Sequence, residues 1–374
     1  MSLRAILPRS SAIPIITCLL ILSGCGAPPL PGGTRPVIKI GLTAPFEGLK
    51  RPLGYEALLG TKLALAERNA AGGVGGYMVE LVALNDFGEA DEARWQAREL
   101  AADPAVMGVV TGWTGETARA SLPVYRQEGM AVAVAWSVPA ELADQKAGMA
   151  LVAADVQQVA GVLARAVAAD HPQRLVVVGD EPTVTPYFES LSALGLKVQM
   201  VSPPNAGDGL QTWAAHLTQS RMQPPDALFL TTDGDLAGES LLALAALDWT
   251  GATFGSVDTG SVHLVDVAGD VADGLVFASP APTGRDLMAG YDTLGPRAVL
   301  GYDATQVLLD ALELAVRQDG RPTRPGVATA LPTVRRHGLT GPIAFDAAGR
   351  RVEAPVWLYT IVDRDYPGQM FLTP

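Results

Sequence analysis

Cysteine is nearly absent from this chain of 374 residues, in which Cys18 and Cys25 are the only two. Everything after Cys25 must therefore fold without an internal disulfide. A chain of this length does not need one, because it can bury a large hydrophobic core. Single cores stop growing near ~250–300 residues, so we expect the chain to divide into two lobes.

Long apolar runs are also missing. The run from Ala12 to Leu22 is about half of the ~20 residues that a membrane-spanning helix requires. No later segment offers ~18 uninterrupted apolar residues, so we expect no spanning helix. The short run follows the positive charges of Arg4 and Arg9, an arrangement that is typical of an export signal.

The residues that end this run, Leu22-Ser23-Gly24-Cys25, resemble the lipobox of bacterial lipoproteins at every position. The resemblance implies that residues 1–24 are a cleaved signal peptide and that Cys25 becomes the lipid-bearing first residue, anchored to a membrane. The alternative is an ordinary signal peptide with an accidental cysteine. Residues 25–35 are rich in proline and glycine, which is typical of a tether.

Positive charge is scarce. The formal net charge is −12, and it becomes two units more negative without Arg4 and Arg9. This balance disfavours nucleic acid and anionic membrane surfaces as partners, and it favours solubility. We therefore expect no nucleic-acid partner, and we expect membrane contact only through the lipid on Cys25.

Signatures of catalysis and of metal binding are missing as well. No nucleophile elbow or phosphate-binding loop is present, and residues 72–76 are glycine-rich but lack the Lys-Ser/Thr of such a loop. The acidic run from Asp86 to Glu92 lacks the spacing of a calcium loop and predicts the start of a helix instead. We expect no enzyme, no cofactor and no metal. The histidines, which lack metal-ligand spacing, are His171, His216, His263 and His337.

The rest of the chain alternates between short apolar runs and helical segments. Helical spacing of apolar residues begins at Asp155 and again at Asp303. The apolar runs are rich in Val, Ile and Leu, which predicts parallel strands covered on both faces by helices. We therefore expect an α/β fold with two α/β/α sandwich lobes. The predicted strands are residues 37–43, 78–85, 107–111, 130–135, 174–179, 197–202, 226–231, 252–257 and 274–278.

Several motifs, in consistent order from about residue 36, resemble one protein family. They are Ile38-Lys39-Ile40-Gly41, Pro45, Gly48, Gly54, Gly60, Asn69 to Gly76, Asn85-Asp86, Gly301-Tyr302-Asp303-Ala304, and Gly338 to Asp346 with Gly349. On these residues the chain is identified as similar to type I periplasmic binding proteins, of the leucine/isoleucine/valine-binding branch.

The resemblance implies two lobes with parallel sheets, joined by a three-crossover hinge, that clamp a ligand between them. Lobe 1 is expected to span residues 36–150 with about 280–342, and lobe 2 residues 151–279 with about 343–374. The family further implies delivery of a small molecule to an ABC transporter permease. We also expect an exported protein and a monomer. Ligand contacts are expected at the strand-to-helix turns, because open α/β sheets bind ligands there.

The hydroxyl clamp of the amino-acid binders of this branch is not intact. In those proteins a serine after the third strand and a threonine after the fourth hold the ligand. The serine position falls here near Gly115, and the threonine position falls at or next to Val138. A slip of one residue in the alignment would give Thr114, Thr117 or Ser137 these roles. Branched-chain amino acids are therefore not directly implied as ligands.

Three aromatic residues, Phe46, Trp113 and Trp136, follow strands of lobe 1 at the expected cleft edge. They predict either an aromatic wall for a ring or a cation, or packing beneath the turns. In lobe 2, Thr232 aligns with a family aromatic that contacts ligand. An aromatic wall opposite carboxylates would favour an amine or a quaternary nitrogen.

Two acidic residues of lobe 2 are candidates. Asp233 either contacts ligand or caps the helix that begins at Gly234, and the cap is the preferred interpretation. Asp258 lies close to the family's acidic partner for a ligand ammonium. Tyr187 lies a few residues from the family's lid tyrosine. Tyr302 and Asp303 either reach the cleft or begin a helix, and we expect the helix start.

The sequence thus predicts a solute-binding lipoprotein that takes up an amino acid or an amine-bearing compound. Two alternatives remain open: a sensor of the same fold that signals to a partner protein without transport, and a scaffold that has lost its ligand.

Overall fold

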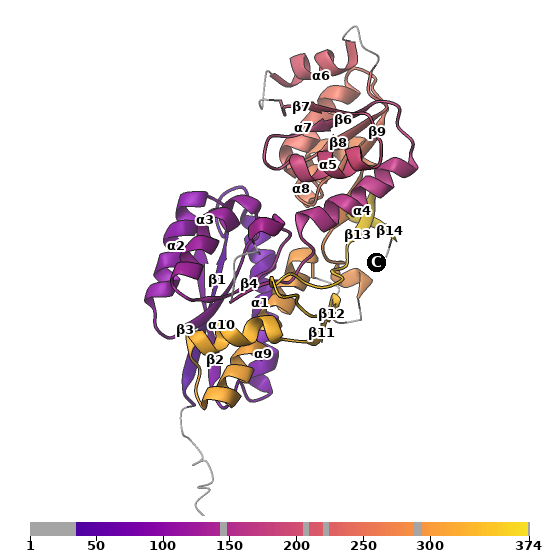
Figure 1. Cartoon of the computed structure of the whole chain (residues 1–374). Coiled ribbons are helices and arrows are strands. Elements are labelled where there is room, and N and C mark those ends of the chain that lie inside the picture. Colours follow the sequence, from indigo (N-terminus) through magenta and orange to yellow (C-terminus); the bar gives the residue numbers. More distant parts are fainter. Residues whose placement is uncertain are drawn as a thin grey trace, which may run out of the picture. The chain divides into compact units, whose positions relative to one another are not determined.

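The computed structural model describes residues 35–142, 148–204, 209–219, 224–287, 290 and 294–372. The predicted signal peptide, Cys25 and all of the tether except Arg35 lie outside these ranges. Within the described ranges, no helix is long and apolar enough to cross a membrane. Strands and helices alternate along most of the chain (Figure 1). The strands form two large sheets and one small hairpin.

The first sheet is entirely parallel, in the order β2-β1-β3-β4-β5. Consecutive residues of its strands face opposite sides of the sheet. Val109 packs against α2 and α3 on one side, whereas Val110 packs in the core that includes α1 and α9 on the other. The strands are β1 (Val37–Ala44), β2 (Met78–Asn85), β3 (Val106–Thr111), β4 (Ala131–Val134) and β5 (Met149–Leu151). The helices are α1 (Arg51–Ala70), α2 (Ala90–Ala102), α3 (Gly115–Gln127), α9 (Pro296–Asp319) and α10 (Arg324–Ala330).

The second sheet is mixed, in the order β14-β13-β10-β9-β8-β6-β7. Its central strands are parallel, and β13 and β14 pair antiparallel at one edge. The strands are β6 (Leu175–Val178), β7 (Val198–Val201), β8 (Ala227–Leu230), β9 (Ala252–Gly255), β10 (Val276–Ser279), β13 (Trp357–Val362) and β14 (Asp365–Leu372). The helices are α4 (Val156–Ala169), α5 (Thr185–Ala193), α6 (Gly209–Gln219), α7 (Gly234–Ala245) and α8 (Val262–Ala268).

All nine predicted strands form, each within two residues of its expected bounds. The sequence patterns did not predict β5, β13 and β14, nor the hairpin of β11 (Arg336–Gly338) with β12 (Gly341–Ile343). β5 and the hairpin strands have three residues each, too short for a clear pattern. β13 and β14 are joined directly to each other, so the strand-helix alternation does not mark them. Short 3₁₀ helices lie at Ala140–Leu142, Gly269–Ala272, Gly284–Asp286 and Leu331–Thr333.

Several helix starts agree with the sequence analysis. α4 begins with a capping box, in which Asp155 accepts a hydrogen bond from the Gln158 N–H and the Gln158 side chain accepts one from Asp155. α2 begins immediately after the acidic run and carries Asp91 and Glu92 in its first turn. There they favour the positive end of the helix dipole.

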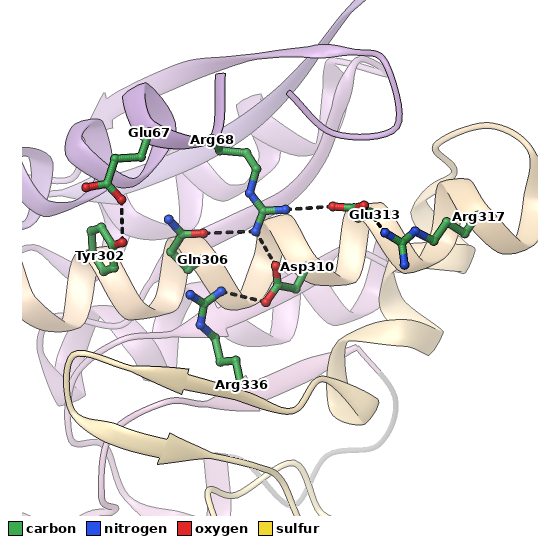
Figure 2. A network of polar contacts seen from close by, with 8 residues as sticks. All are labelled: Glu67, Arg68, Tyr302, Gln306, Asp310, Glu313, Arg317 and Arg336. Atoms are coloured by element: carbon green, nitrogen blue, oxygen red, sulfur yellow. Dashed lines mark hydrogen bonds and ion pairs between the residues drawn. The ribbon is translucent and has the colours of Figure 1, made fainter. Parts of the chain in front are cut away.

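α1 and α9 pack at very short range because glycine lies at their contact. A Cβ atom added to Gly60 would lie 1.8 Å from the carbonyl oxygen of Ala298. Polar side chains extend this contact along the helix pair (Figure 2). Arg68 of α1 reaches Gln306, Asp310 and Glu313 of α9, and Tyr302 donates to Glu67 at 2.6 Å.

The expectation that Asp303 begins a helix is wrong. α9 begins seven residues earlier, at Pro296, and Asp303 is fully buried in its middle. Its carboxylate accepts hydrogen bonds from the backbone N–H groups of Leu339 and Thr340 and from the Thr340 hydroxyl, at 2.6–2.9 Å. Burial raises the pKa of Asp303, and these donors oppose that rise. Asp303 therefore anchors the β11–β12 hairpin to α9.

We predict that Asp303→Ala lowers the free energy of unfolding by about 3–5 kcal/mol, because it leaves two buried donors of Thr340 and the partly buried Leu339 N–H without their acceptor. Chemical denaturation measures this. Asp266→Ala in α8, where the side chain is exposed, serves as the control and should change stability by less than about 0.5 kcal/mol. Equal effects of the two substitutions would contradict the anchoring role.

Candidate functional site

A cleft of about 660 Å³ is lined by turns and helix starts that belong to both sheets. Its volume is in the range of small-molecule sites. From the first sheet come the β1–α1, β3–α3 and β4–β5 connections and the starts of α2 and α9. From the second come the β6–α5, β8–α7 and β9–α8 connections. The residues used below are Lys50, Arg94, Thr114, Glu116, Arg119, Ser137, Tyr187, Asp233, Asp235, Asp258, His263 and Arg297.

Charges of opposite sign line the two sides of this cleft. The elements of the first sheet supply the cations Lys50, Arg94, Arg119 and Arg297, with Glu116 as the one acid there among the lining residues. The elements of the second sheet supply three carboxylates, which are Asp233, Asp235 and Asp258. The cleft thus suits a ligand that carries charged groups, because it can offer a partner to each.

Arg297 is the most buried of these cations, with an exposed fraction of 3%. It is the second residue of α9, and its backbone N–H donates to Oε1 of Glu56 at 3.2 Å. The guanidinium lies 4.0 Å from the centroid of the Trp136 ring. Its Nε atom is buried, and the whole guanidinium makes no hydrogen bond or ion pair among the described residues.

Asp258 lies in the β9–α8 turn and is half-buried. Burial raises the pKa of its carboxyl group, whereas the charge of Arg297, the Trp136 indole and the charge of Lys50 lower it. The Trp136 N–H lies near Asp258, although no hydrogen bond of normal geometry joins them. Asp258, Trp136 and Arg297 thus form one electrostatic group that draws on both sheets.

Of the predicted hydroxyl residues, Thr114 and Ser137 line the cleft and Thr117 does not. Thr114 caps α3 by accepting from the Thr117 N–H at 3.2 Å. Thr117 is buried and pairs with the Thr114 hydroxyl at 2.9 Å. The Ser137 hydroxyl donates to the Ala154 carbonyl at 2.7 Å, which leaves its lone pairs as acceptors.

The three predicted aromatic residues are not among the lining residues of the cleft. Trp113 is 1% exposed and packs in the core beside Gly301. Trp136 is 2% exposed, and the Arg297 guanidinium stacks on its ring. Phe46 is half-buried, with its ring edge-to-face against Tyr55 at 6.1 Å. Of the three, Trp136 contacts a lining residue, because the Arg297 guanidinium lies over its ring.

In the second-sheet part, Asp233 lines the cleft and also caps α7 by accepting from the Leu236 N–H at 3.1 Å, as the preferred interpretation expects. Thr232 is half-buried with an unpartnered hydroxyl and is not a lining residue. Tyr187 lines the cleft from α5 and packs on Phe229 with ring centroids 5.1 Å apart.

The cations of the cleft were not predicted from the sequence. Arg297 gave no signal because the late helix was expected to begin at Asp303, which left Arg297 in a loop. Lys50, Arg94 and Arg119 precede or lie within helices, where basic residues are usually solvated. Among the described residues, no cluster of His, Cys, Asp and Glu is arranged to hold a metal ion.

Comparisons with known proteins bear on this site. No curated protein matches the sequence significantly. Three similar solved structures are a leucine-binding protein LivK from Thermotoga maritima, LivJ from Streptococcus pneumoniae in complex with isoleucine, and a fatty acid ABC transporter substrate-binding protein from Thermomonospora curvata. All are 19% identical to this chain, with TM-scores of 0.77, 0.77 and 0.74. They cover 90%, 90% and 91% of this chain, which covers 98%, 100% and 94% of theirs.

At this identity the likeness shows a shared fold, the type I periplasmic binding protein fold. The sequence itself gives the family, since residues 37–366 match the model described as periplasmic binding protein. That match spans all but the ends of the described chain. The protein therefore belongs to the periplasmic binding protein family.

Proposed function

We propose that this protein is an exported lipoprotein that binds a small molecule in the cleft and delivers it to an ABC transporter permease. The observation that carries the proposal is the cleft itself, which offers cations from one sheet and carboxylates from the other. The membership in a family of periplasmic binding proteins supports it.

Such a cleft gives a physical basis for capture. A ligand that contacts both sides stabilises the closed arrangement by the difference between its affinities for the closed and open forms. A permease can then distinguish the liganded protein from the free one. A ligand that contacts one side alone would provide no such signal.

The charges favour a ligand of the amino-acid class. A carboxylate would face Lys50, Arg119 or Arg297, and an amine would face Asp258, with Thr114, Ser137 and Asp233 as further polar contacts. Proteins of the same fold are described as binding leucine, isoleucine and, in one case, as serving a fatty acid transporter. The fold therefore accommodates ligands with and without an amine.

We predict that at least one member of a panel of amino acids, polyamines, betaines, amides and aromatic acids stabilises the purified protein. A ligand at 100 times its dissociation constant adds about 2.7 kcal/mol, which raises the unfolding midpoint by about 3–6 °C. Thermal unfolding measures this. A panel without any shift would contradict the proposal in favour of a scaffold that has lost its ligand.

Asp258→Asn should reduce that shift, without abolishing it, for a ligand that bears an amine, because it removes one of the carboxylate charges that line the cleft. Asp266→Asn is the matched control, since it removes the same charge from an exposed position of α8 outside the lining residues. Equal binding by both variants would exclude Asp258 as a ligand contact.

For the anchor, we predict that Cys25→Ser moves the protein from the membrane fraction to the soluble fraction of the cell. The substituted chain lacks the thiol that the lipobox resemblance assigns to lipid. Fractionation followed by immunoblotting measures the distribution, with Cys18→Ser as the control. Membrane retention of the Cys25→Ser chain would contradict the lipoprotein assignment.

A further inference from the structure

Arg297 stacks on Trp136, but its buried charge has no ion-pair partner among the described residues. Its exposed fraction is 3%, and no carboxylate among the described residues forms an ion pair with its guanidinium. Glu56, Asp258 and the hydroxyl of Tyr366 lie within electrostatic reach, yet none accepts a hydrogen bond from it. Glu56 instead accepts from the Arg297 backbone N–H.

A second buried arginine, Arg351, forms the hydrogen bonds that the Arg297 guanidinium lacks. Arg351 is 2% exposed, and its guanidinium donates to the carbonyls of Val152, Thr340 and Pro342 and to the Thr340 hydroxyl, at 2.7–3.1 Å. Burial lowers the pKa of Arg351 to about 10. The two arginines are equally buried, but only Arg351 has its donors satisfied.

Leaving a buried charge unpaired is costly, so such groups are normally satisfied by a protein partner or by a ligand. Arg297 is one of the residues that line the cleft, and its Nε atom is buried without a hydrogen-bond partner. A planar guanidinium presents paired N–H donors that match the geometry of a carboxylate. The missing partner is therefore expected to come from outside the chain and to be an anion.

The position of Arg297 also changes what Trp136 and Asp258 offer a ligand. The guanidinium covers the face of the Trp136 ring, which is where a ligand cation would stack. The charge of Arg297 also favours the ionised form of Asp258. The protein's own cation thus already occupies the aromatic-and-acid group that a ligand ammonium would use.

We infer that the ligand carries a carboxylate that binds the Arg297 guanidinium, and that an amine on the ligand is dispensable. The inference rests on the proposed function and deepens it, from a charged small molecule to an organic acid. The other cations are less suited to this role: Arg94 pairs with Asp91, Arg119 lies 3.7 Å from Glu141, and Lys50 contacts the Gly88 carbonyl.

One test needs no knowledge of the ligand. Arg297→Met keeps a long side chain over Trp136 and removes the unpaired charge, so the unfolding midpoint of the ligand-free protein should rise by about 3 °C. Arg351→Met, the matched control, should lower the midpoint because it orphans four acceptors. A fall of similar size in both variants would mean that Arg297 is a structural residue and would overturn the inference.

A second test compares matched ligands on the full protein. Each set contains an amino acid, the acid that lacks its amine, and the amine that lacks its carboxylate. The first set is leucine, 4-methylpentanoate and isoamylamine. The second set is phenylalanine, 3-phenylpropanoate and phenethylamine. We expect an acid and its amino acid to bind with affinities within about tenfold, and the amine to show no binding by calorimetry. Arg297→Met should bind the acid about 100-fold more weakly, whereas Arg297→Lys should recover part of that loss.

The outcomes separate this inference from the function on which it rests. If an amino acid and its amine bind but the deaminated acid does not, the inference is overturned while the proposed function stands. Unchanged affinity of Arg297→Met for an acid overturns it as well. If no compound of the wider panel binds the protein at all, both the inference and the proposed function fail.

Discussion

The contact between α1 and α9 is the constraint on which the site depends. Gly60 lets the backbones touch, Arg68 joins the two helices through three side chains, and Asp303 ties α9 to the β11–β12 hairpin. Because α9 is fixed in this way, its first turn has a defined place at the edge of the first sheet. Arg297 lies in that turn, and its guanidinium is positioned over Trp136 instead of forming an ion pair with a carboxylate. Rigid placement can thus keep a charge unpaired that a mobile side chain would satisfy.

The division of charge across the cleft follows from the topology. Parallel strands in each sheet direct their following turns to one edge, and the turns of both sheets contribute to the cleft. The first-sheet side supplies cations and the second-sheet side supplies carboxylates, and the charge of Arg297 acts on Asp258 across the cleft. A ligand anion would satisfy Arg297 and reduce the cost of its burial, so binding and stability are coupled in this account. Function then explains an arrangement that stability alone would disfavour.

Much of the fold could be predicted from the sequence, because uninterrupted apolar runs such as Leu175 to Val178 mark buried parallel strands. The turn residues Thr114, Ser137, Asp233 and Asp258 follow directly from those strands, and all line the cleft. Arg297 could not be found in the same way, because a long connection with a 3₁₀ helix separates the start of α9 from the preceding strand β10. Asp303 was misplaced for a related reason. In the sequence alone, an aspartate near apolar residues at helical spacing predicts a helix cap. Its hydrogen bonds to Leu339 and Thr340, which are distant in the chain, are seen only in the structure.

The most direct test of the central claim is a crystal structure of the protein with an organic acid bound. This account predicts that a carboxylate of the ligand lies within hydrogen-bonding distance of the Arg297 guanidinium, with both groups between the elements of the two sheets. It would be contradicted by a structure in which the ligand carboxylate lies elsewhere and Arg297 is paired with a carboxylate of the protein itself.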